Sequence, residues 1–172
     1  MKRIIVALIV LVSFLSCQEQ AKIGFIDRTK AINEYQAKID VEEKYKPKNE
    51  AFIKRRDSLV KQFEFDYQNA AVKAQRMSPK QQQELGQEFQ KREALLGQQL
   101  QFEKEQLEKA FSAEIDSTVA RFKSFVKDYG KKNGYNFILG TSELTNSVLY
   151  GEETADITEE LIKAVNEDYK KE

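Results

Sequence analysis

The sequence predicts an α+β fold that is mostly helical, with a long antiparallel helical hairpin inserted after the first strand of a small β-containing body. Three observations lead to this prediction. Apolar residues recur every eleven positions in the middle of the chain, one Ser-Pro step interrupts the helical pattern, and β-type runs lie only near the two ends. We call the hairpin, residues 29–133, the arm, and the remainder, residues 17–28 and 134–172, the body.

The eleven-residue repeat spans residues 85–122. Leu85, Leu96 and Leu107 are eleven apart, and the spacing recurs four residues later in the series Phe89, Leu100, Phe111 and Phe122. Eleven residues in three turns give about 3.67 residues per turn, close to the α-helical value. The segment is therefore predicted to be a long helix that buries one stripe of side chains against a partner, with little supercoil.

The first strand and the first arm helix are predicted from residues 22–75. Residues 22–27 read as a short strand, with Ile23 and Phe25 on one face and Ile26 on the other. Asp27 can cap the helix that follows, which we expect to run to about residue 75. Pro47 lies inside this helix, where it removes a hydrogen bond, so a kink or a restart of the helix is expected there.

The turn of the arm is predicted at residues 77–79. Ser78 is a suitable N-cap, Pro79 suits the first helical position, and Gln81 can complete a capping box. The second helix is expected to run from Pro79 to about Lys132, with a left-handed stop at Asn133–Gly134. Because only two or three residues separate the helices, they must be antiparallel, and the arm should be about 70–80 Å long.

The register of the hairpin follows from folding the chain about residues 77–78. Apolar residues then face one another along the arm, with Arg56 opposite Leu100 as the exception. The predicted pairs are Ala70–Leu85, Tyr67–Phe89, Leu59–Leu96, Tyr45–Phe111 and Val41–Ile115. Agreement between both helices is stronger evidence for a hairpin than either pattern alone.

The C-terminal residues supply the rest of the body. Residues 136–140 and 146–150 read as two further β-type runs bounded by glycines. Asp156 and Glu159 have the spacing of a cap with its acidic partner, and they open an amphipathic helix with Leu161 and Val165 on its apolar face. A body of about fifty residues with an open strand edge is marginal alone, which favours self-association.

The N-terminus has the features of an export signal. Two basic residues precede an apolar run at residues 4–15, which is too short to span a bilayer, so residues 1–16 are predicted to be a signal peptide. Cys17 is the only cysteine of the chain and follows Ser16 at the end of the run. This arrangement resembles the lipobox of bacterial lipoproteins and implies a lipidated Cys17 that anchors the protein to a membrane. The alternative is an ordinary secretory signal.

Composition narrows the function classes. The 28 basic and 28 acidic residues balance, so nucleic acid is not the expected partner, and histidine is absent. The lack of histidine excludes His-based acid–base catalysis, His metal sites and Ser-His triads. The Asp and Glu residues fall in helical charge patterns that are typical of solvated surfaces. We therefore expect no enzyme and assign no catalytic, cofactor-binding or metal-binding residue.

The order of elements resembles the Skp/OmpH family of periplasmic chaperones. The most specific segments are Ile23-Gly-Phe-Ile-Asp27, Gly134-Tyr-Asn-Phe-Ile-Leu139, Ser147-Val-Leu-Tyr150, Asp156-Ile-Thr158 and Leu161-Ile-Lys-Ala-Val-Asn166. The resemblance implies a homotrimer whose bodies join through their strands, and whose arms surround a cavity that holds unfolded outer-membrane proteins without ATP or metal. The trimer contacts would then come from the strand residues Ile23, Phe25, Phe137, Leu139, Val148 and Tyr150.

Candidate binding residues lie on the arm. Four apolar side chains do not fit the hairpin seam and could contact unfolded clients: Val60, Phe65, Leu95 and Phe102. Lys73, Arg76 and Lys80 make the arm tip basic, so it could attract acidic clients or anionic lipids. The alternatives are scattered surface apolar residues and a solubilising surface. A structural coiled-coil lipoprotein that acts as an envelope spacer or adaptor is the competing function.

Overall fold

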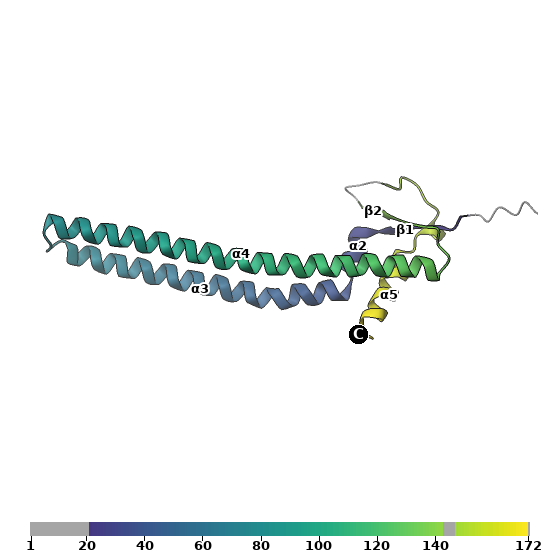
Figure 1. Cartoon of the computed structure of the whole chain (residues 1–172), viewed down its shortest axis with the longest axis horizontal. Helices are drawn as coiled ribbons and strands as arrows, with labels where there is room; N and C mark the ends of the chain where they lie inside the picture. The colour runs from purple at the N-terminus through teal and green to yellow at the C-terminus, as the bar shows by residue number, and fades with distance from the viewer. Residues whose placement is uncertain (1–20, 143–146, 172) are drawn as a thin grey trace, which may run out of the picture.

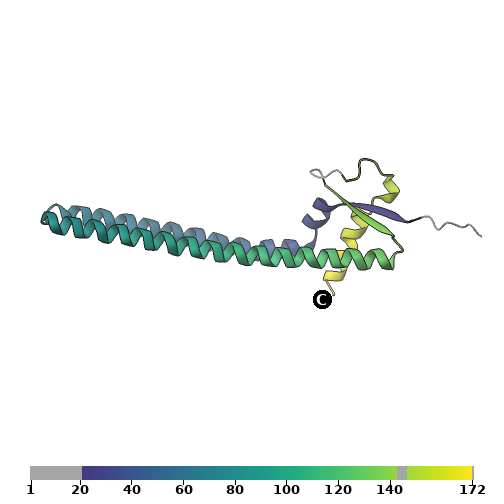
Figure 2. The ribbon, with the colours of Figure 1, turned by 45° about the horizontal axis from the view of Figure 1, so that its top comes forward.

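The computed structural model describes residues 21–142 and 147–171. Its elements are β1 (Ile23–Asp27), α2 (Arg28–Asn33), α3 (Gln36–Ala74), α4 (Pro79–Lys132), β2 (Phe137–Thr141), the 3-10 turn η1 (Glu153–Ala155) and α5 (Thr158–Tyr169). Helices α3 and α4 lie side by side as a long arm, and the strands, α2 and α5 gather at one end of it (Figures 1 and 2). The predicted fold class is confirmed.

The turn of the arm has the predicted capping box. The Ser78 hydroxyl accepts the backbone N–H of Gln81, and the Gln81 side chain accepts the backbone N–H of Ser78 at 2.9 Å. The Gln82 side chain then donates to the carbonyl oxygens of Ala74 and Met77 at 3.0 and 3.2 Å. These bonds add partners for backbone groups at the turn, where the Ala74 carbonyl also accepts the N–H of Met77 at 3.0 Å.

The predicted register is confirmed where ring contacts report it. Tyr67 packs on Phe89 with ring centroids 5.4 Å apart, and Tyr45 packs on Phe111 at 5.3 Å. Leu59 and Leu96 are both half-buried, and their mutual contact stays a prediction. Matching rings at two separate levels fix the pairing of α3 with α4 along the arm.

The first helical segment does not run unbroken from residue 28, as the sequence predicts, because it is interrupted at Glu34–Tyr35. Tyr35 has an extended backbone with ψ 116°. Its buried ring packs on Phe122 and Tyr169 at 5.8 and 6.0 Å between centroids. Asn166 of α5 spans the interruption, accepting the N–H of Gln36 at 2.8 Å and donating to the carbonyl of Glu34 at 3.0 Å. Tertiary contacts thus stabilise a break that local sequence does not demand.

Helix α3 continues through Pro47, so the restart expected there is wrong. Proline cannot donate to the carbonyl four residues earlier, which belongs to Glu43. Both residues lie on the exposed surface, where water can solvate that carbonyl. Packing of the opposite face against α4 therefore keeps the helix continuous despite one missing hydrogen bond.

Strands β1 and β2 pair in parallel, with Ile23 opposite Phe137 and Phe25 opposite Leu139. The arm forms the connection between them. Ile26 of β1 is buried toward the helices, whereas Ile23, Phe137 and Leu139 are exposed on the outer face of the sheet. After α4, Gly134 takes the predicted left-handed conformation with φ 71°, which turns the chain into β2.

The second C-terminal β-type run is not a strand over its described residues, 147–150. These residues form a bend and a loop, and Gly151 lies directly against Phe25, where a Cβ would meet the ring at 2.4 Å. Beyond its pairing with β2, β1 forms a single parallel bridge among the described residues, from Phe25 to Asp156, which lies after this run.

The core of the body includes residues from both arm helices, at the end of the arm that lies in the body. Its buried residues come from β1, α2, α3 and its N-cap, the last turns of α4, and α5 and its N-cap: Ile26, Ala31, Tyr35, Ala37, Phe122, Tyr129, Ile157, Leu161, Ile162 and Val165. Tyr129 of α4 donates a 2.5 Å hydrogen bond to Glu160 of α5, and burial followed by this bond raises the pKa of Tyr129. The arm is therefore anchored in the body through both of its helices.

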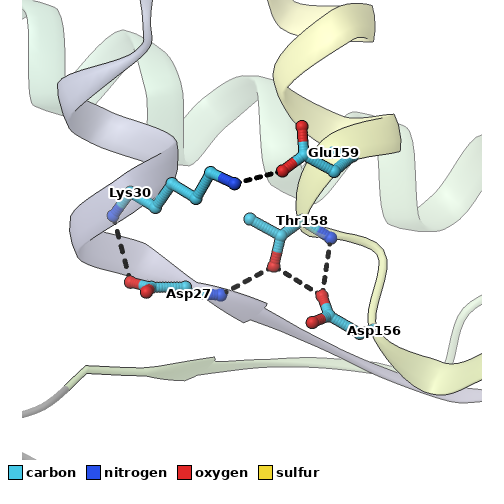
Figure 3. Close-up of polar contacts among 5 residues, drawn as sticks. All are labelled: Asp27, Lys30, Asp156, Thr158 and Glu159. Atoms are coloured by element: carbon cyan, nitrogen blue, oxygen red, sulfur yellow. Dashed lines mark hydrogen bonds and ion pairs between the residues drawn. The ribbon is translucent and has the colours of Figure 1, made fainter. Parts of the chain in front are cut away.

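A cluster of polar contacts joins the first strand to the last helix (Figure 3). The Thr158 hydroxyl accepts the N–H of Asp27 at 2.9 Å, and Asp156 accepts the hydroxyl and the N–H of Thr158 at 2.5 and 2.9 Å. Asp27 caps α2 as predicted, accepting the N–H of Lys30 at 3.0 Å. The predicted Asp156–Glu159 capping box is wrong, because α5 begins after Ile157 and Glu159 instead forms an ion pair with Lys30.

We predict that Asn166→Ala lowers the free energy of unfolding by about 1–3 kcal/mol, because the Gln36 N–H and the Glu34 carbonyl lose their partner. Urea denaturation followed by circular dichroism measures this change. Asn166→Asp is the matched control, since it keeps the acceptor for Gln36 and should be destabilised less. Equal stability of Asn166→Ala and the parent would show that Asn166 does not hold the interruption.

Candidate functional site

The arm carries a set of large apolar side chains that its own seam does not bury. Phe65, Leu95 and Phe102 are 59%, 65% and 61% exposed, and Val60 is 37% exposed. All four are residues that the sequence places off the seam. Because these apolar side chains are exposed to water, a partner can bind them without any unfolding of the arm.

Helical geometry divides these residues into separate groups. Leu95 and Phe102 are seven apart and therefore share a face of α4, whereas Val60 and Phe65 are five apart and point about 140° away from each other. Val72, seven residues after Phe65, is 65% exposed and extends the Phe65 face toward the tip. Sequence reasoning missed Val72, although its spacing from Phe65 was a usable signal.

A groove between α3 and α4 is a feature that sequence reasoning missed. It has a volume of about 560 Å³ and lies in the part of the arm nearer the body. Its apolar lining consists of Tyr45, Phe52 and Ile53 from α3, and Leu100, Leu107 and Phe111 from α4. Arg56 lies at its edge and pairs with Asp57 at 2.7 Å. The mismatch of Arg56 with Leu100 in the predicted register was the only sequence signal for it.

Ion pairs close the other flank of the same stretch of arm. Arg55 binds Glu103 through two hydrogen bonds of 2.6 and 2.9 Å, and Lys44 binds Glu114 through two of 2.8 Å. Ile53 lines the groove, and Arg55 lies two residues further on, about 200° around the helix. The seam is thus closed by charge on one flank and open on the other.

These ion pairs shift the titration of their carboxylates. The hydrogen bond from Arg55, followed by that from Gln99, lowers the pKa of Glu103. The bonds from Lys44 and then from the Tyr45 hydroxyl lower the pKa of Glu114. Hydrogen bonding to Glu114 also raises the pKa of Tyr45. The charged form of each carboxylate is therefore the form that the folded arm stabilises.

The basic tip and the outer face of the sheet are the other predicted sites. Lys73 lies in the last turn of α3, Arg76 in the turn, and Lys80 in the first turn of α4, 4.0 Å from Glu84. On the body, the exposed outer face of the sheet carries Ile23, Phe137 and Leu139. Tyr150, in the loop that follows β2, is also exposed. Phe25 is half-buried beneath Gly151, and Val148 is half-buried in its loop.

The described residues contain no group of three or more His, Cys, Asp or Glu side chains that could hold a metal ion. Over the same residues, no helix is both long and apolar enough to cross a membrane. The predicted signal peptide and Cys17 lie outside the described residues.

Comparisons with known proteins agree with this architecture. The family model for outer membrane protein (OmpH-like) matches residues 22–165. Among solved structures, the chain is similar to a candidate outer membrane chaperone (OmpH-like) from Caulobacter crescentus CB15, with a TM-score of 0.74 and 9% sequence identity. The match covers 87% of this chain and 86% of that one, and at this identity it shows the fold. A comparison with curated proteins gives no match.

We predict that acid weakens the arm below about pH 4.5 in part through Glu103 and Glu114. Both folded pKa values lie below the unfolded value, so the stabilisation is present above the unfolded pKa and is lost as pH falls through the folded pKa. Thermal unfolding from pH 7 to 2.5 measures it. Glu103→Gln/Glu114→Gln should melt lower at pH 7 and converge on the parent in acid.

The control for this experiment is Glu64→Gln/Glu93→Gln. Both carboxylates are exposed on the arm and form no ion pair among the described residues. This control should melt close to the parent across the pH range. Parallel curves for the parent and for Glu103→Gln/Glu114→Gln would show that the two ion pairs do not contribute to the acid sensitivity.

Proposed function

The chain belongs to the OmpH-like family, and on this premise we propose that it is an ATP-independent periplasmic holdase chaperone. Its clients are unfolded outer-membrane proteins, held in a cavity between the arms of a homotrimer. The observation that carries the proposal is the set of large apolar side chains exposed along an arm whose seam is already packed. A helical spacer needs the seam alone, whereas a holdase needs apolar surface outside it.

The chemistry of the arm suits a holdase. Phe65, Leu95 and Phe102 offer apolar contacts without a defined shape, which allows different unfolded sequences to bind. Because the four candidates lie on more than one face of the arm, a client would contact several arms or several faces at once, and many weak contacts together give useful affinity. Release then needs only folding or insertion of the client, which withdraws its apolar segments from the arms.

Trimer formation is proposed from the sheet. A two-stranded sheet is marginal as an independent unit, and here its outer face exposes Ile23, Phe137 and Leu139. Joining three bodies through this face and the neighbouring strand edges would remove apolar surface from water. The proposed contacts are Ile23, Phe25, Phe137, Leu139, Val148 and Tyr150. The basic tip and a lipidated Cys17 would place the trimer at a membrane surface in the periplasm.

We predict that the chain from residue 17 onward is a trimer held by the sheet. Light scattering coupled to size-exclusion chromatography should give three times the mass of one chain. Phe137→Ser/Leu139→Ser should dissociate it at micromolar concentration, whereas Leu95→Ser/Phe102→Ser on the arm should not. A monomeric parent would contradict the assembly.

We predict that changing Val60, Phe65, Leu95 and Phe102 together to Ser weakens client binding. Because exposed positions usually alter stability by about 0.5 kcal/mol or less each, helicity and trimer mass should persist. Protection of a urea-diluted outer-membrane β-barrel protein from aggregation, followed by light scattering, should need about tenfold more chaperone. A parent that gives no protection would instead favour the spacer or adaptor function.

A further inference from the structure

The groove between α3 and α4 is kept open by Gly97. This residue lines the groove in the interior of α4, and a Cβ added to it would meet no atom within 4 Å. The backbone at Gly97 does not require glycine either, because among the described glycines only Gly134 has a positive φ. Glycine inside a helix is less favourable than a residue with a side chain. Packing and backbone within one chain therefore give no reason for Gly97.

The groove continues toward the tip as a row of apolar side chains. Ile53 lines the groove, and Val60 and Tyr67 follow at seven-residue intervals, which places all three on one side of α3. They are 38%, 37% and 54% exposed. At 1.5 Å per residue the row adds about 21 Å, so the whole surface is long and narrow. We call the groove and this row together the groove face.

We propose that the groove face binds an extended apolar segment of the client polypeptide. The inference rests on the proposed holdase function and assigns its deepest contact to a surface between the two helices. The length of the surface fits a polypeptide, because an extended segment of about six residues spans the row from Ile53 to Tyr67. The floor of aromatic and aliphatic side chains would contact the apolar residues of such a segment.

Charge at the edges of the groove supports the same occupant. Lys46, Arg56 and Lys104 alternate with Glu42 and Glu108 around the apolar floor. A strongly charged ligand would meet like charges there, whereas a segment with apolar side chains and mixed polar flanks would not. The opposite flank offers no equivalent opening, since the Arg55–Glu103 and Lys44–Glu114 ion pairs cover it. The groove is therefore a one-sided apolar cleft in an otherwise closed seam.

Gly97→Leu tests the assignment, because the new side chain would fill the groove. Gly86→Leu is the matched control: Gly86 lies eleven residues away on the same face of α4, is equally open around its Cβ, and does not line the groove. Both variants should melt at or above the temperature of the parent, since leucine favours the helix. The readout is fluorescence anisotropy of a labelled outer-membrane β-barrel protein diluted from urea into the full trimer.

We expect Gly97→Leu to raise the dissociation constant by about tenfold or more, and Gly86→Leu to change it by less than about twofold. Equal binding by Gly97→Leu and the parent would overturn the groove assignment while leaving the holdase function intact. Equal losses in both variants would overturn it too, because the effect would not belong to the groove. A parent that binds no client would remove the holdase function and the assignment together.

Site-specific photo-crosslinking gives an independent readout. A crosslinking amino acid at Ile53 should capture the client more efficiently than one at Ser58, which is exposed and points about 140° away on the same helix. Crosslinks from position 53 to a second copy of the chain without client would assign the groove to contacts between arms and overturn the proposal.

Discussion

Tyr35 and Asn166 hold the root of the arm against α5, and the position of nearly every other element depends on this contact. The ring of Tyr35 packs between Phe122 of α4 and Tyr169 of α5. Asn166 satisfies the backbone on both sides of the interruption between α2 and α3. The interruption separates α2, which directly follows β1, from α3 of the arm. The junction thus combines aromatic packing with backbone hydrogen bonds that local residues do not supply.

The arm and the body divide the apolar surface of the chain differently. In the body, burial is nearly complete on the inner side, and the exposed residues gather on the outer face of a small sheet. In the arm, burial is limited to a narrow seam, because two helices can cover only one stripe of each other. Large side chains outside that stripe remain in water. This division is consistent with the proposed assembly through the body and the proposed client binding along the arm.

The two flanks of the seam show how local residue choices shape a binding surface. Salt bridges from α3 to α4 occupy one flank, where exposure to solvent keeps the contribution of each pair to stability small. On the other flank lies the groove, whose lining includes Gly97, Leu100 and Phe52. Neither feature alters the helical pattern, so both are compatible with the same hairpin. The two flanks of the arm can therefore differ in surface chemistry while packing at the seam maintains the hairpin.

Local chemistry in the sequence determined the helices of the arm, its turn and its register. The eleven-residue repeat reports directly which residues a helix buries, and Ser78-Pro79 with Gln81 satisfies the helix end through neighbouring groups. Strand β1, the Asp27 cap and the stop at Gly134 follow from equally local rules. The off-seam residues of the arm were predictable for the same reason, since position on a helix follows from spacing alone.

Tertiary structure decided the interruption at Tyr35, the start of α5, the loop at residues 147–150 and the groove beside Gly97. Each involves groups distant in the sequence: Asn166 supports the interruption, Lys30 pairs with Glu159 at the start of α5, Gly151 after the loop lies against Phe25, and the groove needs both helices. A glycine or an arginine inside a helical pattern does not show whether the facing helix fills the space beside it. Such features depend on packing and hydrogen bonds between residues that are far apart in the sequence. The helix or strand propensity of single residues does not report these contacts.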